Sequence, residues 1–284
     1  DGLTPVRGGY GLYYDRTLVG IALQNAFVNP PFAFNAVFNA SGAAVPTLSN
    51  PRGGTQRNNE ALVPGLIAMS PDFRTPRVHQ YSLGVQRQLP WNFVADVAYV
   101  GGQGRDLVRF IDINRTRAGA TAPTNAARPY PGYGNIQFRE TTATSSYNSL
   151  QVAVSRRFEE GLLLNVNYTL SKAVSDSSSD RNAADFPQYQ GNLEAERAVT
   201  AYDRTHIFGA HYVWELPFFA DRGNLLLYNT LGGWQSSGST KIASGVPLTV
   251  TTGVNSANSF GQGAVLRPDL VGDPDDAPGD VEEF

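Results

Sequence analysis

Residues 150–170 read LQVAVSRRFEEGLLLNVNYTL, and this stretch decides the fold. Two runs of alternating apolar and polar residues flank Glu159, Glu160 and Gly161. A period of two predicts β-strands, because successive side chains leave a strand on opposite sides. A three-residue loop that closes on glycine predicts a hairpin built from a type I turn and one left-handed residue. The strands then pair residues whose numbers sum to 320, so that Val154 faces Val166.

The two faces of this hairpin differ in polarity. One face is apolar, and we expect its residues to contact lipid: Leu150, Val152, Val154, Leu164, Val166, Tyr168 and Leu170. The other face carries small and polar side chains, and we expect four of them to point into an aqueous lumen: Gln151, Asn165, Asn167 and Thr169. Lipid outside and water inside is the pattern of a transmembrane β-barrel strand.

Composition agrees with an all-β chain and excludes several other classes. The chain has 284 residues, with 29 glycines and 18 prolines, as expected where turns and long loops join many strands. The net charge of −3 argues against nucleic acid as a partner, and the lack of cysteine excludes disulfides and zinc–thiolate sites. No apolar run is long enough for a transmembrane helix. The first residue is Asp1 and no signal segment is visible, so we expect an interior piece of a longer protein.

Seven segments alternate, and the connections between them alternate in length. The expected strands are residues 6–15, 78–89, 93–100, the two hairpin strands, 203–218 and 231–243, with a further short strand at 136–142. Short turns lie at Pro90, Glu160 and Ala220, whereas residues 17–75, 101–146 and 175–202 form long loops. Outer-membrane barrels show this asymmetry, with short periplasmic turns and long extracellular loops. A soluble sandwich or propeller also alternates, but it has no reason to keep its long loops at one end.

Aromatic and basic residues favour the membrane alternative. We expect interfacial anchors near the short turns at Arg87, Trp91, Arg156, Phe158 and Phe218, while Tyr81, Tyr99 and Tyr168 lie toward the opposite ends of their strands. Two aromatic levels separated by aliphatic residues match the girdles of a membrane barrel. The general preference of aromatic residues for strands explains their number but not this sorting. The two arginines fall on the apolar face, where a height close to the headgroups lets them snorkel.

Further polar residues are expected inside the barrel. Gln86 faces Asp96 if the hairpin at Pro90 pairs residues whose numbers sum to 182. Glu215 and Lys241 also point inward by their position in the alternation. Polar residues are expected in any water-filled barrel, so they identify no substrate.

A series of short motifs covers nearly the whole chain in order: RGGYGLYYD (7–15), YSLGVQR (81–87), YVG (99–101), RPYPGYG (128–134), SYNSLQ (146–151), YTLSK (168–172), NLEAER (192–197), DRTH (203–206), LPF (216–218), GGWQ (232–235), SGVP (244–247) and RPDLVGDP (267–274). Together these motifs resemble the barrel domain of Oar-like TonB-dependent outer-membrane transporters. The resemblance implies an N-terminal carboxypeptidase-regulatory-like domain, a plug and a barrel of about 22 strands. It also implies energy supplied by the TonB complex through the missing N-terminal part. Residues 1–284 would then be a partial barrel domain without plug or remaining strands.

No catalytic, cofactor or metal motif emerges from the sequence. His206 and His211 face opposite sides of one strand, His79 lies on another, and no nucleophile elbow or dinucleotide loop occurs. Acidic loop residues could collect calcium, but they lack EF-hand spacing and are better explained as solvated acids: Asp176, Asp180 and Asp185, and Asp273, Asp275 and Asp276. Three glycosylation triplets, at Asn39, Asn114 and Asn167, receive little weight. We therefore expect no enzyme.

Two functions remain open. The first is part of an outer-membrane transporter that contacts lipid and moves an unknown ligand. The second is a structural or adhesive surface barrel whose long loops bind cells or polymers. Seven strands is an odd number, so we expect an open, curved antiparallel sheet that closes no barrel by itself.

Overall fold

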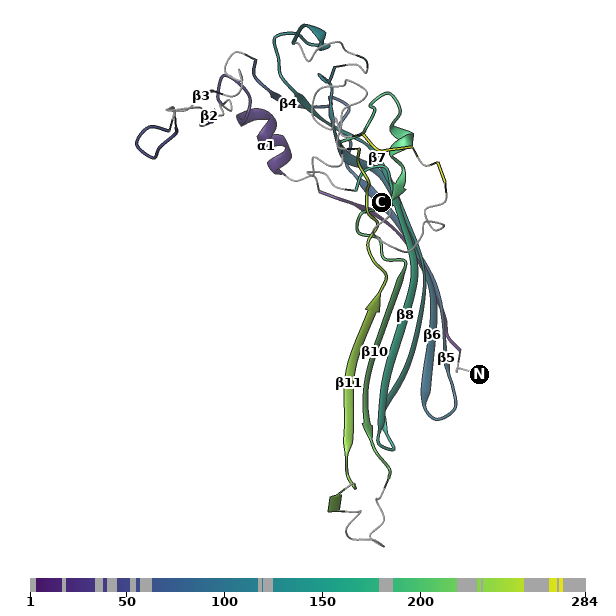
Figure 1. Ribbon diagram of the computed structural model, residues 1–284. Helices are drawn as coiled ribbons and strands as arrows, with labels where there is room; N and C mark the ends of the chain where they lie inside the picture. Colours follow the sequence, from purple (N-terminus) through teal and green to yellow (C-terminus); the bar gives the residue numbers. More distant parts are fainter. Residues whose placement is uncertain are drawn as a thin grey trace.

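The computed structural model describes residues 4–16, 19–33, 38–39, 45–51, 55–56, 63–116, 119, 125–178, 186–218, 229–230, 232–252, 266–269 and 271–272. These residues form a long, curved and open β-sheet (Figure 1). Its seven main strands are β1 (Val6–Tyr14), β5 (Arg77–Gln88), β6 (Phe93–Asp112), β7 (Ile136–Glu159), β8 (Leu162–Ser175), β10 (His206–Glu215) and β11 (Gln235–Ala243). They lie side by side in that order, and each pairs antiparallel with its neighbours. The expected fold class is confirmed: a mostly antiparallel sheet that does not close into a barrel.

The predicted registers of two hairpins are confirmed. Val154 pairs with Val166, as the sum of 320 requires. Gln86 pairs with Asp96, as the sum of 182 requires. Both registers follow from keeping the apolar residues of neighbouring strands on one face, because a shift by one residue would exchange the faces.

The turn between β7 and β8 is tighter than the sequence predicted. Both Glu160 and Gly161 have positive φ, 49° and 77°, which is typical of a two-residue type I′ turn. Glu159 pairs with Leu162 directly across this turn. The extra residue enters a β-bulge instead, where Arg157 and Phe158 together face the single Leu163. The predicted three-residue turn is therefore wrong, although the register beyond the bulge is the predicted one.

Two strands are much longer than predicted. β6 continues twelve residues past Val100, and β7 begins at Ile136, so the expected short strand at 136–142 is the start of one continuous strand. The sequence predicts a long loop after Val100, in a stretch rich in proline, glycine and asparagine. Backbone pairing with β7 continues the strand there, with irregular register after Gly104. The remaining strand ends differ from prediction by a few residues, as is usual for element boundaries.

The long connections contain structure of their own. Within the expected loop 17–75 lie α1 (Val19–Phe27), the small pair β2 (Phe38–Asn39) and β3 (Thr55–Gln56), and β4 (Leu66–Met69). β4 runs parallel to the start of β7. Other connections carry the 3₁₀ turns η1 (Asn125–Ala127) and η3 (Leu193–Glu196), and β9 (Ala198–Val199), which pairs with β8. Figure 1 shows these elements gathered at one end of the sheet, with the turns of the β5–β6 and β7–β8 hairpins at the other.

Burial is concentrated at the loop end. Six apolar residues of the described part are buried there and along the adjoining strands: Ile21, Phe110, Ile136, Ala143, Ala173 and Phe186. The largest fully buried side chains are polar ones, Asn114, Thr200 and Asp112. The part of the sheet nearer the hairpin turns instead exposes large apolar side chains on its strands. None of the described helices is long and apolar enough to cross a membrane.

Candidate functional site

Four of the polar residues expected in the lumen lie on one row of the sheet. Residues that pair across neighbouring antiparallel strands lie on the same face. Successive pairs run from β5 to β11 through Gln86, Asp96, Ala153, Asn167, Gly209 and Lys241. We call this the inner polar row. It brings an acid, a base and two amides from four strands onto one face of the sheet, along a single row of paired residues.

Small residues leave room for the longer side chains of this row. A Cβ placed on Gly209 would lie 2.8 Å from Oδ1 of Asn167, so the amide lies over the glycine backbone. The adjacent row toward the short turns is also polar, because Asn165 pairs with both Ser155 and His211. Two adjacent rows of the inner face therefore carry side chains that can donate and accept hydrogen bonds.

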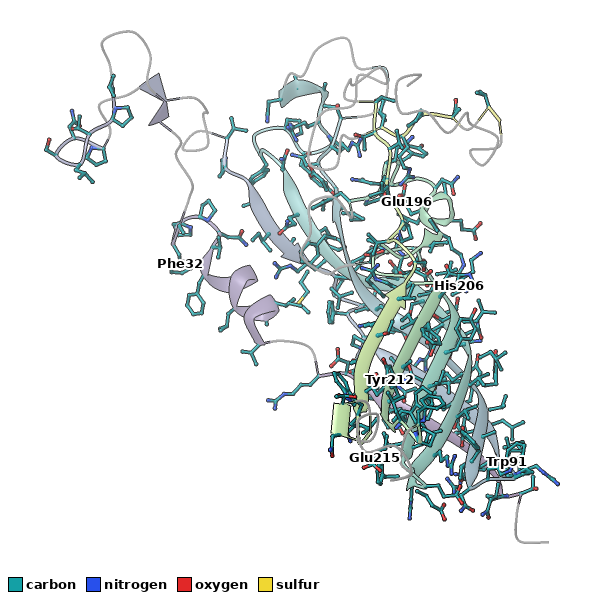
Figure 2. The ribbon with its side chains drawn as sticks, turned by 60° about the horizontal axis from the view of Figure 1, so that its bottom comes forward. Phe32, Trp91, Glu196, His206, Tyr212 and Glu215 are labelled. Carbon is teal, nitrogen blue, oxygen red and sulfur yellow. The ribbon has the colours of Figure 1, made fainter. Side chains whose placement is uncertain are left out.

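Two other expected lumen residues lie away from the inner polar row. Gln151 pairs with Thr169 one row closer to the loops and donates to Oγ of Ser149, 3.3 Å away. Glu215 ends β10 beside the β7–β8 turn, where its backbone N–H donates to the carbonyl of Gly161. Figure 2 shows Glu215 and Trp91 near one end of the sheet and Glu196 at the other.

The opposite face carries the apolar residues. Leu150 pairs with Leu170 and Tyr99, Val152 with Tyr168, and Val154 with Val166, so these residues share one face, with Leu164 on the same strand face as Val166. Leu83, Tyr99, Leu150 and Leu170 are 57%, 44%, 42% and 40% exposed. Such a contiguous exposed apolar surface marks contact with another apolar phase or partner. That this phase is lipid stays a prediction.

Tyrosine side chains mark the loop-side border of this face. Tyr81 and Tyr99 stack with ring centroids 6.2 Å apart, and both hydroxyls donate to Oδ1 of Asn148. On β8 a hydrogen bond of 2.7 Å joins the hydroxyl of Tyr168 to Nδ1 of His206. Relative to the paired register, Tyr99 lies one same-face row closer to the hairpin turns than Tyr81, and Tyr168 lies one row closer than Tyr99. Tilted strands require such a shift if the three tyrosines are to lie at one height.

The expected interfacial anchors lie near the other border. Arg156 packs 5.4 Å from the centroid of the Phe93 ring and forms an ion pair of 3.0 Å with Glu160. Arg87 donates to Oγ1 of Thr4. The remaining three anchors are exposed near chain turns: Trp91, Phe158 and Phe218. Their positions agree with a membrane border, and their contact with lipid stays a prediction.

At the loop end, a buried network of polar side chains holds the connections together. Asn114 is its centre, with 0% of its surface exposed. Its amide nitrogen donates to the carbonyls of Tyr130, Tyr133 and Gly134, and its Oδ1 accepts from the N–H of Tyr130. One carboxylate oxygen of Asp112 accepts from the backbone N–H groups of Asn114 and Ile136. The RPYPGYG segment is therefore folded around one asparagine.

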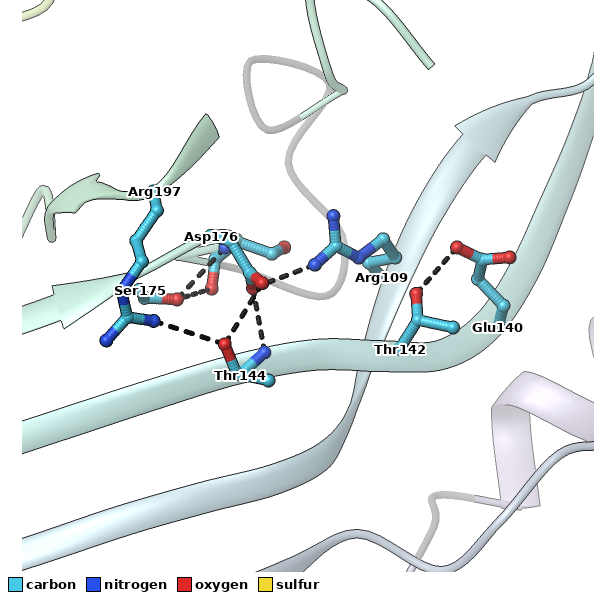
Figure 3. Close-up of polar contacts among 8 residues, drawn as sticks. Arg109, Glu140, Thr142, Thr144, Ser175, Asp176 and Arg197 are labelled. Atoms are coloured by element: carbon cyan, nitrogen blue, oxygen red, sulfur yellow. Dashed lines mark hydrogen bonds and ion pairs between the residues drawn. The ribbon is translucent and has the colours of Figure 1, made fainter. Parts of the chain in front are cut away.

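A second part of this network joins three strands (Figure 3). Arg109 of β6 forms an ion pair of 2.8 Å with Asp176, which follows β8. The same carboxylate accepts hydrogen bonds from the N–H and the hydroxyl of Thr144 on β7. Arg197 reaches Thr144 Oγ1 from the other side, at 3.2 Å. Because the Arg109 side chain is almost fully buried, the carboxylate of Asp176 is needed to balance its charge.

Further arginines attach the loops to this core. Arg139 donates to the carbonyl of Ile21 in α1 and lies 4.7 Å from the Phe110 ring centroid. Arg115 donates to the carbonyl of Pro187, and burial lowers the pKa of its guanidinium, although Asp112 and Glu196 oppose that shift. Arg267, from the segment after β11, binds both carboxylate oxygens of Glu196 at 2.7 and 3.0 Å.

Sequence reasoning missed the buried loop network. Asp176 was considered as a calcium ligand, yet it pairs with Arg109, and Asp180, Asp185, Asp273, Asp275 and Asp276 lie outside the described residues. Within the described part, no three His, Asp or Glu side chains gather into a possible metal site. The triplet at Asn114 has a structural reason, because its amide is enclosed by backbone carbonyls. The one sequence signal for this network was the RPYPGYG motif. Its partner in the structure, Asn114, lies 14 or more positions earlier in the chain.

Comparisons with known proteins found a matching family model and similar solved structures, two of which are described here. The family model described as outer membrane beta barrel domain matches residues 1–283. The outer membrane transporter YddB from Escherichia coli aligns with 75% of this chain at 11% identity and a TM-score of 0.45. The FrpB iron transporter from Neisseria meningitidis aligns with 55% at 13% identity and a TM-score of 0.33. The chain spans 24% and 19% of their lengths, respectively. No curated protein sequence matches it.

Proposed function

The chain belongs to the outer membrane beta barrel domain family, and on that premise we propose that it forms part of the wall of a TonB-dependent transporter. It is a protein of the outer membrane. In this proposal the apolar face contacts lipid, the inner polar row lines the lumen, and the loop end lies outside the cell. The protein would bind and move a ligand without transforming it.

The inner polar row is the observation that carries this proposal. Any water-filled barrel needs polar side chains on its inner face, but transport also requires inner groups that a ligand can contact as it passes. Here Asp96 and Lys241 lie on one register row of the inner face, with Asn167 between them. Such groups replace the hydration of a polar ligand, which lets the ligand pass without a large desolvation cost.

The loop network supports a receptor role. A ligand-binding surface needs positions that stay fixed, because ordering a loop during binding costs affinity. Buried hydrogen bonds around Asn114 and the ion pair of Arg109 with Asp176 provide that rigidity. The resemblance of the motifs to Oar-like transporters supports energy supply by TonB.

Adhesion is the second candidate, because the loop end exposes aromatic residues. Phe32, Tyr130, Tyr189 and Tyr202 are each more than half exposed. Exposed aromatic residues on a rigid support are suited to contact with polymers or other cells. This candidate requires no energy coupling and no passage through the lumen.

Comparison of gene deletions separates the two candidates. The gene for the full-length protein and the tonB gene are deleted singly and together, and solutes left in the growth medium are quantified by mass spectrometry. Transport predicts that both single deletions leave the same solute unconsumed and that the double deletion adds nothing for that solute. Unchanged solute uptake, together with lost attachment to cells or polymers, would reject transport in favour of adhesion.

A further inference from the structure

Cationic side chains follow the tyrosine border on the apolar face. Lys172 lies four positions beyond Tyr168 on β8, and Arg105 lies six positions beyond Tyr99 on β6. Arg197 and Arg204 come from the segments that flank β9 and β10. All four are exposed, and we call them the basic belt: Arg105, Lys172, Arg197 and Arg204.

Pairing and hydrogen bonds put the belt on the lipid side of the sheet. Lys172 pairs with Asn148, whose side chain binds the hydroxyls of Tyr81 and Tyr99. Arg197 donates to Oγ of Ser146, two positions from Asn148 on the same face of β7.

The two ends of the belt lie on this face as well. Arg204 lies two positions before His206, which is bonded to Tyr168, and donates to the carbonyl of Ser244. Arg105 pairs with Arg77, which in turn pairs with Tyr14 on the outer face of β1. The belt therefore continues the apolar face toward the loops.

The charges of the belt are not balanced by the nearest acids. Arg105, Arg197 and Arg204 donate to neutral oxygens, on Gln103, on Thr144 and Ser146, and on Ser244. Neighbouring carboxylates in the described part are bound elsewhere. Asp106 pairs with Arg77 at 3.0 Å, Asp176 with Arg109 at 2.8 Å and Glu196 with Arg267 at 2.7 Å. The carboxylate of Asp203 accepts from the backbone N–H of Ala173. A zone of positive charge thus borders the apolar face at its loop end.

We propose that the basic belt binds the phosphate groups of a phosphorylated glycolipid in the outer leaflet. Four residues along a strand span about 13 Å, which is the scale of a headgroup region above the tyrosine level. Exposed Lys and Arg beside a membrane border are attracted to anionic headgroups, and Arg offers paired donors to phosphate oxygens. The inference rests on the proposed function only for its orientation, with the loop end outside.

Lipid retention by the full-length protein tests the proposal. The purified protein is incubated in detergent with diphosphorylated lipid A, its dephosphorylated form, or phosphatidylglycerol, and bound lipid is counted by native mass spectrometry. The variant is Arg105→Gln/Lys172→Gln. Its matched control is Arg7→Gln/Lys241→Gln, which removes one arginine and one lysine from the inner face, where Arg7 pairs with Gly84.

We expect the wild type and the control to retain diphosphorylated lipid A in preference to both other lipids. The belt variant should lose about fivefold in affinity for each removed cation. Equal retention by variant and wild type overturns the proposal, as does equal retention of the dephosphorylated lipid. Retention of phosphatidylglycerol as strong as that of lipid A also overturns it, since a general anion surface needs no glycolipid. Solute uptake is measured separately, so failure here leaves the transport test untouched.

Discussion

The ring of Tyr81 lies directly over the backbone of Gly101 on the neighbouring strand. The two residues pair across β5 and β6, and a Cβ on Gly101 would lie 2.2 Å from Cε2 of the ring. The glycine leaves room for the tyrosine to lie flat and stack on Tyr99. Covering a strand glycine with a cross-strand aromatic ring is a known way to stabilise a sheet.

Gly101→Ala should therefore destabilise the β5–β6 pair. The added methyl group forces the Tyr81 ring away, which removes its stacking on Tyr99, an interaction of about 0.5–1.5 kcal/mol. Unfolding of the full-length protein by denaturant in detergent measures the change in free energy. In a Tyr81→Ala background the same substitution should cost less, because the ring is already absent.

Gly102→Ala is the control for this prediction. Its added Cβ would meet only the carbonyl oxygen of His79, at 3.8 Å, an ordinary contact. It should change stability much less than Gly101→Ala. Equal effects at both positions would mean that backbone freedom, rather than the covering ring, is the reason for the glycine.

The two faces of the β7–β8 hairpin should differ in chemical access. Cysteines introduced at Val154 and Asn165 in the full-length protein lie on opposite faces of the sheet. A lipid-soluble maleimide should label Val154→Cys, and a charged, water-soluble one should label Asn165→Cys. The reverse pattern, or equal labelling by both reagents, would show that the apolar face is not the lipid face.

Asn114→Asp should loosen the loop end. The carboxylate has no N–H to give to the carbonyls of Tyr130, Tyr133 and Gly134, and it adds negative charge beside Asp112. Each buried carbonyl left without its donor costs about 1–3 kcal/mol. Limited proteolysis should cleave the connection before β7 faster than in the wild type. The matched control is Asn50→Asp, the same change at an exposed position, and comparable cleavage in both variants would contradict a central role for Asn114.

The two arginine–acid pairs should differ strongly in their contribution to stability. Asp176→Asn removes the charge partner of Arg109, whose side chain is 3% exposed, and should cost about 3–5 kcal/mol. Glu160→Gln removes a partner that is 81% exposed and should cost less than about 1 kcal/mol. Denaturant unfolding of both variants provides the comparison. A small loss for Asp176→Asn would show that Arg109 is solvated.

Where one face of the sheet is apolar, sequence periodicity was enough to predict the strands and their pairing register. Residues 150–170 alternate cleanly, so pairing by the sum of 320 placed Val154 against Val166. The alternation ends after Val100, and the continuation of β6 could not be predicted, because it depends on pairing with β7. The type of turn was also missed, since the extra residue could enter either the loop or a bulge.

The candidate site likewise has one part that the sequence could predict and one part that it could not. The register of two hairpins already puts Gln86 opposite Asp96, and the alternation puts Lys241 on the same face. The loop network could not be predicted, because Asn114, Arg109 and Arg267 bind groups far away in the chain. Such contacts have no period, and each depends on how a long connection folds back.

The loop end should lie outside the cell. The turns of the β5–β6 and β7–β8 hairpins lie at one end of the sheet and the long connections at the other (Figure 1). The basic belt lies on the loop side, because Lys172 pairs with Asn148 and Arg197 bonds to Ser146. An epitope tag inserted after Ser178 of the full-length protein should bind antibody on intact cells. A tag after Asn92, in the β5–β6 turn, should bind antibody only once the outer membrane is disrupted. The opposite result would place the loops in the periplasm and remove the basic belt from the outer leaflet.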